Sequence, residues 1–299
     1  MQTIFEYSPA VKHALENKQP ILALESTIIT HGMPYPENYQ TATALEQITR
    51  DHHVTPATIA LIKGKIKIGL STEELNYLAQ DKSVAKASRR DLGFMVSQKM
   101  SAGTTVAATL YCAANAGIKV FATGGIGGVH RGDNGDVSAD LIELARNPVA
   151  VVCAGAKAIL DLPRTLEYLE THSIPIIGYR TQVLPAFYTD NTDHVLPATA
   201  NDVGILSDIV KTHWQLGLAS GLLIVNPIPA AEAISRSEIE PAIHSALEKA
   251  QQQNLSGKAL TPFLLSEVAK ITQGKSVKAN IALIKNNVLL GAKLANSLG

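Results

Sequence analysis

Two ionisable side chains stand at points in the sequence where burial would make them reactive. Glu25 follows the apolar run Ile21–Leu24, and Lys157 follows the largely apolar run Val149–Ala156. Burial raises the pKa of a carboxyl group toward the range of a general acid, and it lowers the pKa of a lysine so that the amine can act as a nucleophile. Two structural alternatives stay open: a salt bridge from Glu25 to a neighbouring lysine, and a Lys157 whose ammonium reaches solvent at a helix start.

A glycine-rich loop is the second feature with chemical meaning. Gly124–Gly128 contains four glycines after the predicted strand Lys119–Thr123. It lacks the Gly-Lys-Ser/Thr of a Walker motif, and His130 stands where the dinucleotide fingerprint needs a third glycine. Free backbone N–H groups would make the loop a phosphate cradle, whereas a tight turn would need glycine for positive φ. Behind it, His130 is a candidate contact to a base edge and Arg131 a candidate phosphate clamp, or both are solvated loop residues.

Three further charged residues are candidates for ligand binding. Lys86 belongs to the charged segment Lys86–Asp91, which is either a solvated face or part of a phosphate site. Asp136 and Asp140 are four residues apart, so a helix opening at Asp136–Leu141 would place them on one face. One of them could bind a hard divalent cation through oxygen, with water completing the shell. Alternatively, both serve the dipole at the helix start.

Short apolar runs that alternate with helical segments predict the elements that position these residues. A mostly parallel central sheet with helices on both faces is expected, because continuous apolar strands need cover on each side. Polar groups follow several strands, and ligands bind at the carboxyl ends of such strands. The predicted strands are Pro20–Leu24, Ala57–Ile62, Lys65–Leu70, Lys119–Thr123, Val149–Cys153, Ile174–Gly178, Leu222–Val225 and Asn280–Ile284, with a hairpin at Gly64 and helices over Thr104–Asn115 and Leu162–Thr171.

Bulk composition limits the partners. The chain of 299 residues is predicted to be a single domain, 1–299, and its 26 basic and 26 acidic residues provide no broad field for a nucleic acid polymer or a membrane surface. Cys112 and Cys153 lie in apolar runs, as expected of buried thiols in a reducing compartment. Met1–Gln19 carries charges and has no signal-peptide pattern. We therefore expect a cytoplasmic protein with a small anionic ligand.

Taken together, the motifs resemble a known family. The chain is similar to the pseudouridine-5′-phosphate glycosidases, also called the indigoidine synthase A-like family, and the similarity extends over nearly its whole length. The segments that carry it are Ala23–Pro34, Lys86–Leu92, Gly103–Ala107, Ala122–Gly132, Asp136–Leu141, Cys153–Asp161, Asn226–Pro229, Thr261–Leu265 and Ala279–Leu283.

The resemblance implies an α/β/α sandwich, a homotrimer and a specific reaction. That reaction is the reversible cleavage of the C–C glycosidic bond of pseudouridine 5′-phosphate to uracil and ribose 5-phosphate. Glu25 matches the proton donor, Lys157 the nucleophile that forms an imine with ring-opened ribose, and Asp136 the ligand of one divalent cation, usually Mn²⁺. The implied substrate contacts are Lys86, Val106, Thr123, His130, Ser138, Ala139, Asp140 and Asn280.

Two segments depart from the family pattern, and two other functions stay open. Tyr179–Phe187 lacks an acidic pair expected before Pro185, and the Arg131–Asp136 loop is short. Both departures concern the entrance of the site. The alternatives are a lysine-dependent aldolase or lyase on another sugar phosphate, and a non-catalytic regulator that binds a sugar phosphate.

Overall fold

The computed structural model describes residues 4–132, 135–190 and 192–299. Its strands are β1 Phe5–Tyr7, β2 Ile21–Leu24, β3 Thr55–Ile62, β4 Lys65–Ile68, β5 Ala85–Ala87, β6 Ala102–Thr104, β7 Val120–Ala122, β8 Val129–His130, β9 Ala150–Cys153, β10 Leu160–Asp161, β11 Ile176–Tyr179, β12 Ala198–Ala200 and β13 Leu222–Val225. Its α-helices are α1 Pro9–Glu16, α2 Glu37–Asp51, α3 Thr72–Gln80, α4 Leu92–Ser97, α5 Val106–Asn115, α6 Ala139–Arg146, α7 Leu162–Thr171, α8 Val203–Gln215, α9 Arg236–Gln252, α10 Leu260–Ile271 and α11 Lys275–Leu298.

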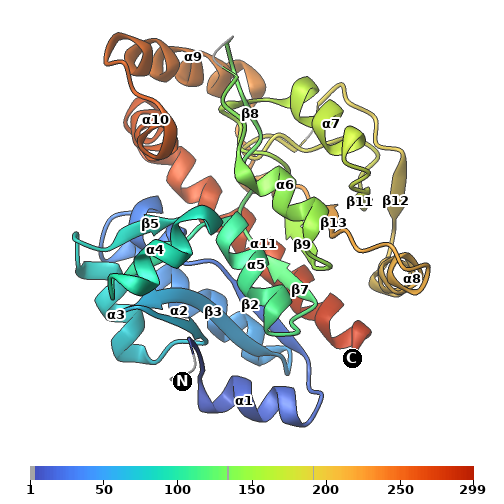
Figure 1. The fold of residues 1–299 in the computed structure, drawn as a ribbon. Coiled ribbons are helices and arrows are strands. Elements are labelled where there is room, and N and C mark those ends of the chain that lie inside the picture. The colour runs from blue at the N-terminus through green and yellow to red at the C-terminus, as the bar shows by residue number, and fades with distance from the viewer. Residues whose placement is uncertain (1–3, 133–134, 191) are drawn as a thin grey trace.

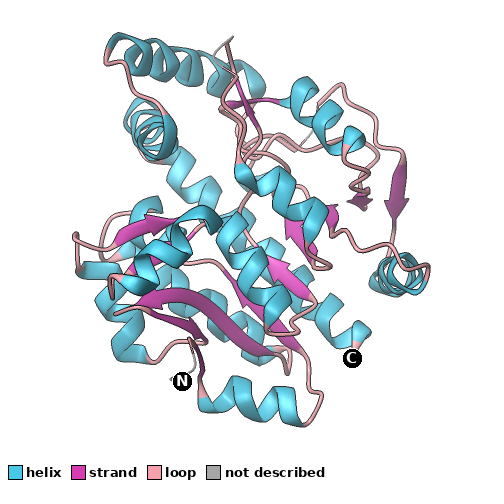
Figure 2. Cartoon of the chain, viewed as in Figure 1, coloured by secondary structure: helices cyan, strands magenta, loops and turns pink. Residues whose placement is uncertain are grey.

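A mostly parallel sheet forms the centre of the molecule (Figures 1 and 2), as the sequence predicted. Its main path runs β1-β4-β3-β2-β7-β9-β13-β11-β12, and every neighbouring pair from β3 to β12 is parallel. The hairpin at Gly64 is confirmed, because β3 and β4 pair antiparallel. Strands β2, β7, β9 and β13 are buried along their whole length, which explains their continuous apolar sequences.

Helices cover both faces of the sheet (Figure 1). The long helix α11 packs on β2, β7 and β9, and α5 and α6 lie on the other side of these strands. Gly291 permits close approach of α11, since a Cβ there would lie 3.0 Å from a methyl group of Leu22. This arrangement confirms the α/β/α sandwich. The prediction that 1–299 forms one domain stays a prediction.

Two predictions of local structure were wrong. Asn280–Ile284 is not a strand but part of α11, whose 24 residues continue the helix on both sides of that segment. The predicted helix from Thr104 begins at Val106, because Thr104 ends β6 and Thr105 caps the helix by accepting from the Ala108 amide. Strands β9 and β11, which α7 connects, are parallel in the sheet, and β13 lies between them.

The segment Asp136–Leu141 also differs from its prediction. Helix α6 begins at Ala139, and Ser138 caps it by accepting from the Asp140 amide. Asp136 therefore precedes the helix, and the expectation that it shares a helix face with Asp140 was wrong. No helix within the described residues is long and apolar enough to cross a membrane. Cys112 and Cys153 are both free and buried.

Candidate active site

Neighbouring strands bring the two reactive candidates together. Glu25 follows β2 and Lys157 lies shortly after β9, and β7 runs between these strands with Thr123 at its end. Because the three strands are parallel, their carboxyl ends meet at one edge of the sheet. Residues more than 130 positions apart in the chain thus share one site.

A charged cavity of about 530 Å³ opens at this edge. Its walls come from the ends of β2 and β5, the first turns of α5 and α6, and the segment before α10. The ionisable side chains that line it are Glu25, Lys86, Arg89, Arg90, His130, Asp136, Asp140, Glu143, Arg146, Lys157 and Lys258. Two helix N-termini face a cavity rich in cations, which favours an anionic ligand.

A second, smaller pocket continues from the charged cavity, and we call it the apolar branch. Its side walls include Ile28, Phe187, Pro262 and Leu265. The polar groups of His31 and Asn280 also line it. Glu25, Thr27, Lys86 and Lys157 line both pockets and therefore mark the junction between them. A ligand with one charged part and one flat, largely apolar part would place the bond between the two parts at this junction.

Glu25 is held in a position suited to proton transfer. Its side chain is half-buried at the junction, and the Thr123 hydroxyl donates to its Oε1 at 2.6 Å. Burial raises the pKa of Glu25 above its ordinary value, while the charge of Lys157 and the hydrogen bond from Thr123 act in the opposite direction. The net rise makes the carboxyl group easier to protonate near neutral pH.

Lys86 is a cation that is held next to another cation. It lies in β5, which pairs with β6. Burial is the main cause that lowers the pKa of Lys86 to about 8, and Lys157 acts in the same direction, whereas Asp140 and Glu25 oppose the shift. An electropositive pair at the junction is suited to hold an anion, and the lowered pKa of Lys86 makes its ammonium easier to deprotonate.

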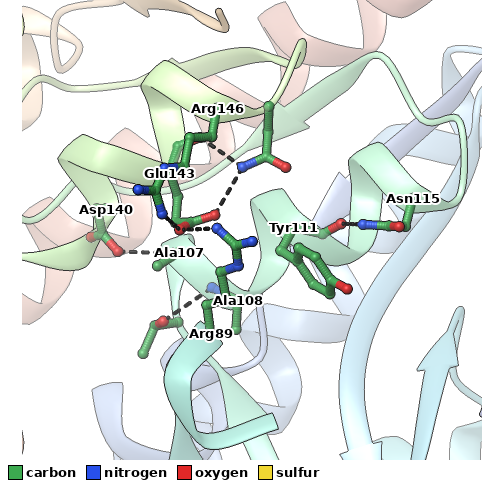
Figure 3. A network of polar contacts seen from close by, with 10 residues as sticks. Arg89, Ala107, Ala108, Tyr111, Asn115, Asp140, Glu143 and Arg146 are labelled. Carbon is green, nitrogen blue, oxygen red and sulfur yellow. Dashed lines mark hydrogen bonds and ion pairs between the residues drawn. The ribbon is translucent and has the colours of Figure 1, made fainter. Parts of the chain in front are cut away.

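Asp140 is a structural anchor of the cavity wall (Figure 3). Its Oδ1 accepts from the Ala107 amide at 2.8 Å, and its Oδ2 accepts from the Gly127 amide at 2.7 Å. These bonds connect the first turns of α5 and α6 to the glycine-rich loop. The two charge-assisted bonds fix the geometry of the wall.

A buried carboxylate, Glu143, supports the same wall (Figure 3). Glu143 is 2% exposed, and its Oε1 accepts from Nη1 of Arg89 at 2.6 Å. Its Oε2 accepts from the side-chain amide of Asn147 at 3.0 Å, and Nη1 of Arg146 lies 3.8 Å from Oε1. Arg89 also lies over the ring of Tyr111 at 4.9 Å. Such a paired arginine keeps its position while presenting positive charge to the cavity.

The glycine-rich loop is held by contacts within the protein and does not need positive φ. The Ile126 amide donates to Gly155 O at 3.1 Å and the Gly127 amide donates to Asp140, so these two N–H groups are not free for a phosphate. Positive φ does not explain the four glycines, which adopt ordinary φ values. They allow close packing instead: a Cβ at Gly125 would lie 2.6 Å from the Phe187 ring. Close packing against neighbouring residues therefore explains why glycine is needed in this loop.

His130 and Arg131 have different surroundings. His130 is 8% exposed and lies in the charged cavity, where its Nε2 is 3.9 Å from Oδ2 of Asp136. Arg131 points elsewhere: it pairs with Glu240 at 3.1 Å and donates to the Ala158 and Leu160 carbonyls. The proposed phosphate clamp at Arg131 was therefore wrong.

Asp136 fits a weakly held hard cation rather than a closed metal centre. Its side chain is 33% exposed and lines the charged cavity. The described residues contain no group of three or more histidine, cysteine, aspartate or glutamate side chains that could hold a metal ion. A cation at Asp136 would therefore take most of its ligands from water and from a bound anion.

Comparison with known proteins assigns this chain to a family. The family described as indigoidine synthase A like protein matches residues 10–297. The chain belongs to that family. Relatives named pseudouridine-5′-phosphate glycosidase include one from Caldanaerobacter subterraneus subsp. tengcongensis, 55% identical over 100% of this chain and 98% of the relative, and one from Staphylococcus aureus, 54% identical over 99% and 97%. A solved structure of the prealnumycin C-glycosynthase AlnA in complex with ribulose 5-phosphate has a TM-score of 0.91 and 34% identity, covering 100% of this chain and 98% of that one.

The indigoidine synthase A-like fold gathers nearly all of the residues expected from the sequence. Glu25, Lys86, Val106, His130, Asp136, Ser138, Ala139, Asp140 and Lys157 line the charged cavity, and Asn280 lines the apolar branch. Thr123 is fully buried behind Glu25, so its contact in this structure is with the carboxylate. The individual roles of these residues in substrate binding and catalysis stay predictions.

Several residues of the site were missed by sequence reasoning. Thr27, His31, Arg89, Glu143 and Lys258 all line one of the two pockets. Three of them lie inside segments that carry the family resemblance, so proximity to Glu25 and Lys86 was an available signal. Of the two departing segments, Tyr179–Phe187 supplies Phe187 to the apolar branch. The Arg131–Asp136 loop includes residues 133 and 134, which lie outside the described residues.

Proposed function

We propose that this enzyme cleaves the C–C glycosidic bond of pseudouridine 5′-phosphate reversibly, giving uracil and ribose 5-phosphate. One observation carries the proposal: Glu25, Lys86 and Lys157 surround the junction between a cation-rich cavity and an apolar branch. A sugar phosphate suits the first pocket and a pyrimidine suits the second. The names of the relatives support the substrate, and the sugar phosphate in the AlnA complex supports the class of ligand.

A lysine provides a route that ordinary glycosidases lack. In those enzymes a carboxylic acid protonates a departing heteroatom, but the leaving atom here is C5 of uracil. We infer that ring opening breaks the bond between C1′ and the ring oxygen and leaves a C1′=C5 double bond, and that the Lys157 amine adds to C1′ to give a secondary amine. Once C5 is protonated, the C–C bond breaks as the lone pair of the nitrogen forms an iminium ion. Water then releases ribose 5-phosphate and restores the amine.

Glu25 is the proton carrier in this proposal. Its raised pKa makes the carboxyl group easier to protonate, and the Thr123 hydroxyl fixes the orientation of that group. It can therefore assist ring opening and then deliver a proton to C5. Lys86 balances the charge of the phosphate.

The phosphate would bind at the first turns of α5 and α6. Val106, Ser138 and Ala139 line the cavity there, and helix N-termini offer backbone N–H groups to anions. A divalent cation, which we propose to be Mn²⁺ at Asp136, would neutralise part of the phosphate charge when bound. Its shell would be completed mainly by water. We also propose, from the family resemblance, that the enzyme acts as a homotrimer in the cytoplasm.

The two alternative functions predict different products. The test is to incubate the protein with pseudouridine 5′-phosphate and Mn²⁺ and to quantify uracil and ribose 5-phosphate by chromatography. The proposal expects equal amounts of both products. An aldolase would release an aldehyde fragment from a sugar phosphate without uracil, and a regulator would bind the ligand without turnover; either result would contradict the proposal.

A further inference from the structure

His31 lies in the apolar branch, and the reaction proposed above gives it no function. It belongs to the π-helical turn Ile28–Gly32, which directly follows Glu25 and its two neighbours. The imidazole is half-buried and lines the branch together with Phe187 and Asn280. Most of the remaining wall is apolar, so a polar ring there is suited to recognise a specific edge of the ligand.

The hydrogen bonds of Thr30 define which nitrogen of His31 carries the proton. The Thr30 hydroxyl donates to the Ser26 carbonyl at 3.2 Å, and its Oγ1 lies 2.7 Å from Nδ1 of His31. A hydroxyl has one proton, so Oγ1 must accept from Nδ1–H. Burial, and to a lesser degree Lys86, lowers the pKa of His31, so the ring is neutral at neutral pH. Its Nε2 therefore keeps a lone pair and acts as an acceptor.

The chemistry of the proposed substrate matches an acceptor at this place. When the base is joined through C5, the opposite side of the six-membered ring carries N1–H, the C2 carbonyl and N3–H. Since the bond at C5 must lie at the junction near Glu25 and Lys157, this edge enters the branch. A base joined through N1 would instead present a single N–H there. An acceptor in the branch thus favours the C-linked base.

Building on the function proposed above, we propose that Nε2 of His31 accepts a hydrogen bond from a ring N–H of the pyrimidine and so determines base specificity. Thr30 is a positioning residue in this proposal, because it fixes the tautomer. Asn280 faces the same branch and is suited to the C2 carbonyl. This role differs from a purely structural one, because the effect of substituting His31 should depend on which ring nitrogen of the ligand is methylated.

The test compares substrates within each protein variant. Pseudouridine 5′-phosphate and its 1-methyl and 3-methyl derivatives are assayed for kcat/KM with the wild type, His31→Ala and Thr30→Val. In the wild type, methylation of the contacted nitrogen should reduce kcat/KM about tenfold or more. In His31→Ala the ratio of kcat/KM for the unmethylated substrate to kcat/KM for the methylated one should come within about threefold of unity. The reason is that the acceptor is gone and the methyl group gains space. Thr30→Val should weaken the same ratio, and His244→Ala, a control on an exposed side chain, should leave it unchanged.

Ratios taken within one protein sample are independent of the fraction that is folded. If His31→Ala releases no uracil, the same comparison is made with the Kd of uracil, 1-methyluracil and 3-methyluracil in the presence of ribose 5-phosphate. Methyl discrimination that is identical in the wild type and His31→Ala would overturn the proposal for His31 while leaving the proposed function intact. A wild type that releases no uracil from pseudouridine 5′-phosphate would contradict both the proposed function and the proposal for His31.

Discussion

Lys86 should lose its charge within the range of pH in which the enzyme is assayed. With a pKa of about 8, its ammonium is roughly nine tenths charged at pH 7 and roughly one tenth charged at pH 9. If this charge holds the phosphorylated substrate, kcat/KM should fall as the pH rises through about 8. Lys86→Arg should abolish that fall, because a guanidinium stays charged.

The size of the effect follows from the strength of a charge-assisted hydrogen bond. Such a bond contributes about 1.5–3 kcal/mol, which corresponds to roughly 10- to 150-fold in kcat/KM. Lys86→Met should show this loss already at pH 7. Lys82→Met, which removes an exposed lysine four residues earlier, is the matched control and should behave as the wild type.

The same pKa predicts an opposite effect on stability. The unfolded chain holds the Lys86 proton more tightly, with a pKa of 10.5 against about 8 in the folded protein. The buried charge therefore costs stability below pH 8, and this cost disappears as the pH approaches 10.5. The difference in pKa sets an upper limit of about 3 kcal/mol, and solvent in the cavity should reduce it to about 1–2 kcal/mol. Lys86→Met should accordingly be more stable than the wild type at pH 7.

The assay is a profile of kcat/KM from about pH 6.5 to 9.5 for the wild type and the three variants, with denaturant unfolding at pH 7 and 10. A fall near pH 8 that persists unchanged in Lys86→Arg would assign the titration to another group. A Lys86→Met variant that is less stable than the wild type at pH 7 would refute the burial argument.

Three further predictions test other parts of the site. Thr27 has a buried hydroxyl oxygen for which the described residues provide no hydrogen-bond partner. Thr27→Val should therefore keep the stability or raise it by up to about 1 kcal/mol, while turnover falls about tenfold. Unchanged turnover would show that the hydroxyl does not contact the substrate. Exhaustive chelation should abolish activity, Mn²⁺ should restore it better than Zn²⁺, and Asp136→Asn should require more Mn²⁺; full activity after chelation would contradict a role for the metal. Unphosphorylated pseudouridine should react at least about a hundredfold more slowly than the 5′-phosphate, measured as kcat/KM, and equal rates would exclude the phosphate anchor.

The sequence was most informative where a local pattern and the fold agree. Leu222–Val225 was predicted as a strand with the bounds that the structure has, because a short continuous apolar run is typical of a strand buried on both faces. Asn280–Ile284 has the same local appearance but belongs to a helix. Helix α11 contacts α2, α8 and three strands, so it is buried on several sides and its sequence lacks a clear polar face.

The site was predictable in its strand ends and less so in its loops. Glu25 and Lys157 could be placed because parallel strands end at one edge. The packing of Gly125 against Phe187 joins residues far apart in the chain, and no local rule reveals it. Likewise, the position of Asp136 depended on where α6 starts, which was three residues later than expected.

The central claim is that Lys157 forms a covalent imine with the sugar. The most direct measurement is to add borohydride during turnover of pseudouridine 5′-phosphate and to analyse the protein by peptide mass spectrometry. The wild type should give a reduced ribose 5-phosphate adduct on the peptide that contains Lys157. Lys157→Arg should give neither adduct nor turnover, because arginine cannot lose a proton to attack C1′. Near-normal turnover by Lys157→Arg, or an adduct confined to another lysine, would contradict it.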